Sequence, residues 1–332
     1  MATIAVLGAG AWGTALAHVL GQNGHTVRLW TRDPDHAAAI AAAGENRRYL
    51  PGCPLPAAIE PTADLAAAAA GSDWLLIAVP SAAFRGLVER LPACAPRRIA
   101  WATKGLEARS GGLLHGVLEA LLTPAPTPAV LSGPSFAAEV GRDLPTAVTV
   151  ASPDAAFAHE IAAAFHNEHF RPYVSTDMLG VELGGAVKNV LAVATGISDG
   201  LGLGANARAA LITRGLAEIT RLGEALGADG RTLIGLAGLG DLLLTCTDDQ
   251  SRNRRFGLAL GAGAGVEAAL EQVGSTVEGA RTAGELQALA RAHGVEMPIC
   301  TAVQRILAGE LSPQRAVTEL MERAPKAEFA PD

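Results

Sequence analysis

Lysine is the residue type whose distribution points most directly to chemistry in this sequence. Only three of the 26 basic residues are lysines, Lys104, Lys188 and Lys326, and arginine supplies every other cation. Arginine keeps its proton at any working pH, whereas a lysine can give up its proton when burial lowers its pKa. Lys104 and Lys188 are therefore candidates for proton transfer, and chance retention of these lysines is the alternative.

Lys188 stands in an unusual setting for a cation. Together with Asn189 it interrupts the stretch 180–194, which is otherwise mainly glycine, alanine and branched apolar residues and predicts a helix. A lysine in such a helix either extends to solvent or is held in a site, and we favour the site. Asp241 also lies among apolar residues, where an ionised carboxylate needs a partner. Lys188 is the obvious partner.

Ser251, Arg252 and Asn253 bring a hydroxyl, a planar cation and an amide together within three residues. Charge-assisted hydrogen bonds from such a set suit a phosphate dianion. We therefore interpret these residues as a candidate phosphate site. The alternative is a solvated, charged loop over residues 251–255.

A glycine pattern near the N-terminus indicates a nucleotide. The run GAGAWG over residues 8–13 follows the apolar segment 3–7 and precedes a helical segment over 14–20. In dinucleotide-binding folds these glycines allow a sharp turn, approach of a pyrophosphate and close helix packing. The unpaired amides at the start of the helix then attract phosphates. The motif alone is weak, but a second strand at 26–30 favours dinucleotide binding over a purely structural turn.

The end of the second predicted strand bears on cofactor choice. NAD-specific folds usually place an acid there to bond the ribose 2′-hydroxyl. Here Thr31 and Arg32 follow the strand, and Asp33 comes late, beside a proline. Arg32 can pair with a 2′-phosphate, so we expect NADP to be at least accepted. A solvated arginine is the alternative.

These residues need a scaffold, and apolar runs predict a buried sheet. The predicted strands are 3–7, 26–30, 74–79, 98–102, 129–131, 145–151 and 170–174. Lys104 comes directly after one of them, and open α/β sheets bind ligands at the carboxyl ends of strands. From residue 177 the pattern is helical, with a glycine-rich loop expected over 197–206. We predict an α/β protein: a Rossmann-type dinucleotide-binding domain over 1–180 and an all-helical substrate and catalytic domain over 181–332.

Composition excludes several classes of function. The formal charge of −7 argues against a nucleic-acid groove, which needs a basic surface. Four scattered cysteines favour a reduced, cytoplasmic protein. His166 and His169 lack further ligands nearby in sequence, so we expect no metal. No run reaches transmembrane length without interruption, so we expect no stable membrane anchor.

Seven motifs in order resemble the bacterial-type NAD(P)-dependent glycerol-3-phosphate dehydrogenases. They are GAGAWG at 8–13, NRRYLP at 46–51, ATKGL at 102–106, GPSFA at 133–137, GGAVKNV at 184–190, GLGDLLLTCT at 238–247 and SRNRR at 251–255. The resemblance implies reversible reduction of dihydroxyacetone phosphate to sn-glycerol 3-phosphate with NADP or NAD. It also implies a homodimer in the cytoplasm whose product feeds glycerophospholipid synthesis.

The resemblance further implies which residues carry these roles. Lys188 takes the position of the general acid/base, with Asp241 beside it. The implied substrate site comprises Lys104, Gly133, Ser135, Lys188, Asn189, Asp241, Thr245, Ser251, Arg252 and Asn253. The implied nucleotide site comprises Gly8, Gly10, Ala11, Trp12, Gly13, Arg32, Tyr49, Lys104, Ala137, Arg252 and Glu278.

Two points stay open in the sequence. Repulsion by Lys104 lowers the pKa of Lys188 and Asp241 raises it, and the sequence does not say which effect is larger. A lysine-dependent hydroxy-acid dehydrogenase of the same plan and a non-catalytic NADPH sensor are the competing functions. A small carboxylate substrate does not call for the whole 251–253 cluster. A sensor would keep a buried Lys188–Asp241 pair without using it, at a cost in stability.

Overall fold

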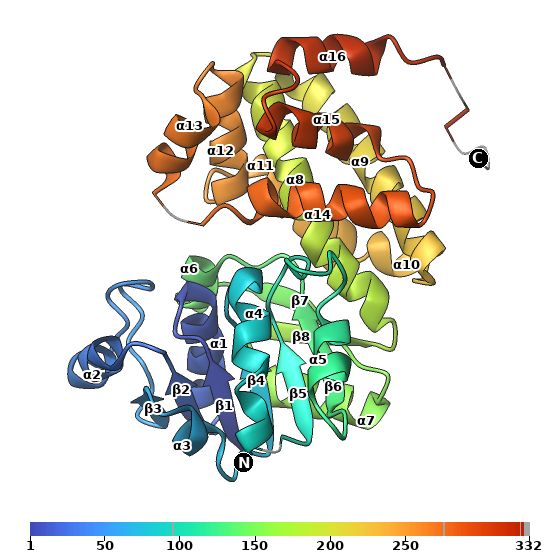
Figure 1. Cartoon of the computed structure of the whole chain (residues 1–332). Helices are drawn as coiled ribbons and strands as arrows, with labels where there is room; N and C mark the ends of the chain where they lie inside the picture. The colour runs from blue at the N-terminus through green and yellow to red at the C-terminus, as the bar shows by residue number, and fades with distance from the viewer. Residues whose placement is uncertain (95, 275, 326, 329–332) are drawn as a thin grey trace.

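A single eight-stranded sheet forms the N-terminal half of the chain (Figure 1). The computed structural model describes residues 1–94, 96–274, 276–325 and 327–328. The sheet order is β3-β2-β1-β4-β5-β6-β7-β8, and all neighbouring strands are parallel except β6 and β7. The strands are β1 Thr3–Leu7, β2 Thr26–Trp30, β3 Ile59–Thr62, β4 Trp74–Ile77, β5 Arg98–Trp101, β6 Thr127–Ser132, β7 Thr146–Ala151 and β8 Phe170–Ser175. The predicted Rossmann-type sheet is confirmed.

Both faces of the sheet are covered, which explains why its strands are continuously apolar. Ile4 and Val6 pack on one face with α1 (Ala11–Gln22) and α7 (Ala155–Phe165). Ala5 and Leu7 pack on the other face with α3 (Leu65–Ala69), α4 (Ser81–Val88) and α5 (His115–Leu121). α2 (Pro34–Ala43) follows β2, and the short α6 (Ala137–Val140) follows β6.

Every element described after β8 is helical, as predicted. The helices are α8 Met178–Gly200, α9 Gly204–Leu226, α10 Gly230–Leu233, α11 Asp241–Thr247, α12 Arg252–Gly261, α13 Val266–Val273, α14 Glu278–Ala292, α15 Pro298–Leu307 and α16 Pro313–Met321. The predicted division at residues 180–181 falls in the first turn of α8. That helix runs from the sheet into the centre of the helical half (Figure 1).

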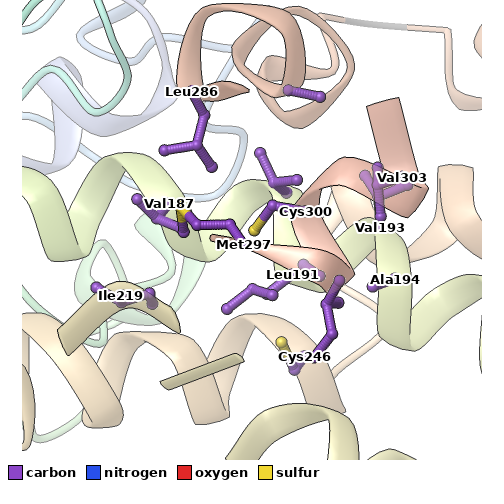
Figure 2. Close-up of a cluster of buried hydrophobic side chains, with 14 of the residues drawn as sticks. Val187, Leu191, Val193, Ala194, Ile219, Cys246, Leu286, Met297, Cys300 and Val303 are labelled. Carbon is purple, nitrogen blue, oxygen red and sulfur yellow. The ribbon is translucent and has the colours of Figure 1, made fainter. Parts of the chain in front are cut away.

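Helix α8 is the core of the helical half. Its side chains Val187 and Leu191 lie in one apolar cluster with residues of α9, α11, α14 and α15 and with the N-cap of α15, among them Ile219, Cys246 and Met297 (Figure 2). The helix is long and apolar enough to cross a membrane by length and composition, with a mean hydropathy of 1.3, but 89% of that window is buried inside the fold. This burial is typical of a core helix.

The loop expected over 197–206 is wrong. α8 continues to Gly200, and only three residues separate it from α9. Gly200 serves helix packing, because a Cβ there would lie 2.4 Å from the Leu258 carbonyl oxygen, whereas Gly202 and Gly204, with φ +73° and +83°, form the short turn into α9. A Cβ added at Gly196 would lie 2.2 Å from the Arg254 carbonyl oxygen, and one at Gly257 would lie 2.2 Å from the Val193 carbonyl oxygen. Glycine therefore lets α8 and α12 approach backbone to backbone.

Candidate active site

The glycine turn between β1 and α1 has the shape that a dinucleotide requires. Gly8 has φ +129°, and a Cβ at Gly13 would lie 1.9 Å from the Gly8 carbonyl oxygen, so both positions need glycine. A Cβ at Gly10 would meet no atom within 4 Å. Gly10 is also the N-cap of α1, without a side-chain cap and without an acid in the first turn. Its helix amides therefore remain available to a pyrophosphate, with Ala11 and Trp12 beside them.

The loop after α2 is fastened to this turn. Asn46, which is fully buried, donates to the Ala9 carbonyl oxygen at 3.0 Å and to Thr14 Oγ1 at 2.7 Å. His36 Nε2 also lies 3.4 Å from the Ala9 carbonyl oxygen. Asn46 comes from the NRRYLP motif, but its anchoring role was not apparent from sequence because the contact spans more than 30 residues. The motif thus positions the next residues of the loop against the cofactor turn.

The carboxyl end of β2 carries a cluster of charges. Arg32 is exposed there. The Asp33 carboxylate caps α2 by accepting from the backbone amides of Asp35 and His36 at 3.1 and 3.2 Å. Arg48 Nη1 lies 3.5 Å from Asp33 Oδ2, and its guanidinium lies 5.1 Å above the ring of Tyr49. The Asp33 carboxylate therefore serves as the cap of α2, while the side chains of Arg32 and Arg48 remain exposed.

Near the carboxyl ends of β5 and β6, away from β2, two lysines share one buried carboxylate. Lys188 Nζ donates to Asp241 Oδ1, the contact expected from the sequence. Lys104 Nζ donates to Asp241 Oδ2 at 2.6 Å and to the Gly133 carbonyl oxygen at 3.0 Å. The side chain of Asp241 is 1% exposed and that of Lys188 is 8% exposed. This three-residue group, Lys104–Asp241–Lys188, is called the lysine–aspartate cluster below.

Burial, more than either charged neighbour, decides the direction of the pKa shift at Lys188. Burial lowers the pKa of Lys188 to about 7; the Asp241 carboxylate opposes this decrease, and the neighbouring Lys104 ammonium adds to it. Removing a charge from water is the dominant effect because the amine lies inside the fold. Lys188 can therefore hold or release a proton near neutral pH, which an exposed lysine cannot do.

Local backbone features place the members of this cluster. A π-helical turn, Leu236–Gly240, leads directly into Asp241 at the start of α11, and such turns are frequent at functional sites. Thr245 Oγ1 donates to the Asp241 carbonyl oxygen at 2.6 Å. Gly185 lets α8 approach the end of β6, because a Cβ there would lie 2.8 Å from Ser132 Oγ, and the Lys104 side chain lies beside it. Lys188 follows one turn later on the same helix.

The segment 251–255 is not a solvated loop. Ser251 is the N-cap of α12, and its Oγ accepts from the Arg254 amide at 3.2 Å. Asn253 Nδ2 donates to Asn189 Oδ1 at 2.9 Å, and Asn253 Oδ1 accepts from the Gly279 amide at 2.9 Å. The residue beside Lys188 is thus tied to the candidate phosphate site.

The two arginines of this segment have different surroundings. Arg254 is buried and pairs with Asp199 at 2.6 Å and with Asp249, so it serves the fold. Arg252 is exposed at the first position of α12. A cation in that place, at the positive end of the α12 dipole, suits an anion.

The remaining predicted residues lie at strand ends or between the halves. Gly133 and Ser135 follow β6, and Ser135 Oγ donates to the Gly133 carbonyl oxygen at 3.0 Å. Ala137 begins α6, whose residues pack beside α1. Tyr49 is 45% exposed in the loop beside Asp33. The structure thus brings Lys104, Gly133 and Asp241 into contact, and Asn189 with Asn253, while Arg32 and Tyr49 belong to the separate cluster at β2.

Glu278 joins the two halves of the chain. Its Oε2 accepts from Ser81 Oγ at 2.8 Å and from Arg281 Nη2 at 2.8 Å. Ser81 begins α4 just beyond β4, at the edge where the dinucleotide is expected. Ser81 and Arg281 were not predicted as partners of Glu278, since neither belongs to a recognisable motif. The position of Ser81 directly after a buried strand was the available signal.

Within the described part of the chain, no group of three or more His, Cys, Asp or Glu residues is placed to hold a metal ion.

Known proteins match the chain along nearly its whole length. Family models described as the N-terminus and the C-terminus of NAD-dependent glycerol-3-phosphate dehydrogenase match residues 3–158 and 177–318. A relative from Halorhodospira halophila, glycerol-3-phosphate dehydrogenase (NAD(P)+), is 72% identical over 98% of both chains. One of the same name from Alkalilimnicola ehrlichii is 61% identical over 96% of this chain and 97% of its own. The crystal structure of a glycerol-3-phosphate dehydrogenase from Coxiella burnetii is 52% identical, with a TM-score of 0.93, over 97% of this chain and 99% of that one.

Proposed function

The chain belongs to the NAD-dependent glycerol-3-phosphate dehydrogenase family, and we propose that it performs the family's reaction with Lys188 as the general acid/base. The enzyme reduces dihydroxyacetone phosphate to sn-glycerol 3-phosphate reversibly, with NAD(P)H as the reductant. The observation that carries the assignment of Lys188 is the lysine–aspartate cluster. It is buried, it lies at the carboxyl ends of the strands, and it adjoins the start of α12 through Asn189 and Asn253.

Lys188 has the properties that proton transfer to a ketone requires. When the nicotinamide nucleotide is bound, it supplies the hydride. Negative charge then develops on the ketone oxygen, where the Lys188 ammonium stabilises the charge and donates the proton. In the reverse direction the neutral amine accepts the hydroxyl proton. Burial of Lys188 makes both forms accessible, since its pKa is lowered from the ordinary value of 10.5.

Asp241 and Lys104 act on this proton in different ways. Asp241 holds the Lys188 amine in place and favours its charged form, whereas Lys104 favours the neutral form. Lys104 is itself bound to the Gly133 carbonyl oxygen, so its ammonium is directed to the substrate region. We assign Lys104 to substrate charge and orientation.

Ser251, Arg252 and Asn253 receive the substrate phosphate in this proposal. The Ser251 hydroxyl accepts from a backbone amide and keeps its own proton to donate. Arg252 is exposed and supplies a planar pair of donors. Phosphate recognition is also what favours this substrate over a hydroxy acid, whose carboxylate would leave part of the site unused.

Arg252→Ala is expected to raise the KM for dihydroxyacetone phosphate by about tenfold or more, since a charge-assisted hydrogen bond contributes about 1.5–3 kcal/mol. Steady-state assays with NADPH measure this change. Unphosphorylated dihydroxyacetone, a poor substrate, should be affected much less. Arg255→Ala is the matched control, because Arg255 is exposed on the same helix and has no role in the proposal. Equal losses on both substrates would show that Arg252 does not serve the phosphate.

The cofactor is NADP or NAD. We propose that Arg32 pairs with the 2′-phosphate of NADP, because Arg32 is exposed after β2 and the nearby Asp33 is engaged in capping α2. Gly8, Gly10 and Gly13 would hold the pyrophosphate, with Trp12, Ala137 and Glu278 beside the nucleotide. The enzyme should therefore use NADPH at least as well as NADH.

We also propose a cellular setting for this activity. The enzyme works as a homodimer in the cytoplasm, without a stable membrane anchor and without a nucleic-acid partner. Its product, sn-glycerol 3-phosphate, supplies glycerophospholipid synthesis. The net charge of −7 supports the absence of a nucleic-acid partner.

A further inference from the structure

We propose that Arg48 is a second residue that determines specificity for NADP. In this proposal Arg48 and Arg32 together bind the 2′-phosphate of NADP. The inference rests on the proposed function, because it assumes that the adenosine ribose lies beyond the carboxyl end of β2. Arg48 belongs to the NRRYLP motif, but the resemblance implies a role there only for Tyr49. The basis of the inference is the way in which the loop after α2 is built.

The loop holds Arg48 at a defined place relative to the cofactor turn. Asn46, two residues earlier, is fully buried and bonds to Ala9 and Thr14 in the turn itself. The Asn46 carbonyl oxygen also accepts from the Leu50 amide at 2.8 Å. The backbone between these residues is therefore closed into a turn against α1, and Arg48 lies within it.

The side chain of Arg48 is directed to the end of β2. Its Nη1 lies 3.5 Å from Asp33 Oδ2, next in sequence to Arg32. One face of the guanidinium rests 5.1 Å from the centre of the Tyr49 ring, and that ring meets His36 edge-on at 5.3 Å. A stacked arginine keeps its planar donors free at the rim. The side chain is still 60% exposed, so those donors are accessible to a ligand.

Charge at this site favours an added phosphate over the present ion pair. Both amides of α2 bond to Asp33 Oδ1, whereas Arg48 faces Oδ2. The Asp33 side chain is 43% exposed, so water can serve Oδ2 when Arg48 turns to a ligand. An exposed pair at 3.5 Å contributes little to stability, whereas an arginine–phosphate contact forms two parallel charge-assisted bonds. Arg48 can therefore exchange Asp33 for a 2′-phosphate. NADH offers only a hydroxyl at that position and gains little from a second arginine.

The neighbouring residue provides a matched control. Arg47 is also exposed, at 74%, and differs from Arg48 in its partner. It lies 3.4 Å from Glu45 Oε2, and the other oxygen of Glu45 accepts from the Gly52 amide at 2.6 Å. Arg47 is therefore paired within its own loop, with a different carboxylate from the one that Arg48 faces.

The test measures the direct binding of NADPH and of NADH in the absence of substrate. Cofactor fluorescence reports the binding. The proteins are the full-length parent and Arg48→Ala, Arg48→Lys, Arg47→Ala and Arg32→Ala. Arg48→Ala should weaken NADPH binding by about five- to tenfold, the scale of one charged contact at an exposed site, and leave NADH binding unchanged. Arg48→Lys should fall between parent and alanine, because it keeps the charge without the paired donors. Arg47→Ala should match the parent for both cofactors.

Binding of NADH shows that each variant is folded, so every outcome is informative. The inference is overturned if Arg48→Ala weakens both cofactors alike, weakens neither, or behaves as Arg47→Ala does. Arg32→Ala separates this failure from failure of the proposed NADP site. If Arg32→Ala weakens NADPH selectively and Arg48→Ala does not, only the role of Arg48 is wrong. If Arg32→Ala affects both cofactors alike, the proposed 2′-phosphate site at β2 is wrong as well.

Discussion

Replacing Lys188 by arginine is expected to lower turnover by about 10²–10⁴-fold, the usual contribution of general acid–base catalysis. Arginine keeps the positive charge but cannot give up a proton at working pH. NADPH affinity should survive, since Lys188 lies on α8 and makes its contact with Asp241, away from the glycine turn. Turnover and NADPH binding of Lys188→Arg and Lys188→Ala measure the two effects separately.

The comparison of the two variants decides whether the proton or the charge matters. If Lys188 only supplied charge, arginine would keep much of the rate and alanine would be far worse. Lys104→Arg is the companion variant, because Lys104 shares Asp241 but is assigned to orientation. It should retain more turnover than Lys188→Arg. A Lys188→Arg enzyme within a few-fold of the parent would end the acid/base assignment and make Lys104 the next candidate.

Asp241→Asn is expected to have the second largest effect and to act more on reduction than on oxidation. The Asp241 carboxylate raises the pKa of Lys188 against burial and Lys104, so its loss lowers that pKa further. Less ammonium is then present at neutral pH to protonate the ketone, and each unit of decrease costs about tenfold in the reduction rate. Rates in both directions, measured across pH, test this expectation. Reduction should recover as the pH is lowered.

A surface aspartate provides the control for this change. Asp154→Asn alters an exposed N-cap of α7, where asparagine caps equally well, and should change neither rate nor stability. Asp241→Asn should also destabilise the fold, because removal of one partner leaves buried charge uncompensated. A variant with the parent's pH profile in both directions would show that Asp241 does not tune Lys188.

Sequence predicted best where local and long-range preferences agree. The segment from β1 through the glycine turn to α1 was placed well because an apolar strand, three glycines and a helical run all specify one arrangement. β3 was missed because its sequence, IEPT, contains a proline and no apolar run. Pro61 is tolerated there because β3 is an edge strand. The C-terminal part of α8 was predicted wrongly because Gly196 and Gly200 are required for close packing against α12, which lies far along the chain.

The site was predictable in its chemistry more than in its connections. The contact of Lys188 with Asp241 followed from the rule that a buried carboxylate needs a partner. The contact of Lys104 with the same carboxylate spans 137 residues, and no local pattern encodes it. The anchoring of the loop by Asn46 and the bond from Ser81 to Glu278 are of the same kind. The balance of effects on the Lys188 amine depends on burial, which only the assembled fold defines.

The pH dependence of sn-glycerol 3-phosphate oxidation tests the central claim, that Lys188 exchanges the proton, most directly. The neutral amine is the active form in this direction, so kcat/KM should rise with pH through the lowered pKa of Lys188, about 7, and then level off. Reduction should show the opposite slope, because it needs the ammonium. Lys188→Arg should lose this inflection in both directions while it still binds NADPH. An inflection that persists unchanged in Lys188→Arg would contradict the account.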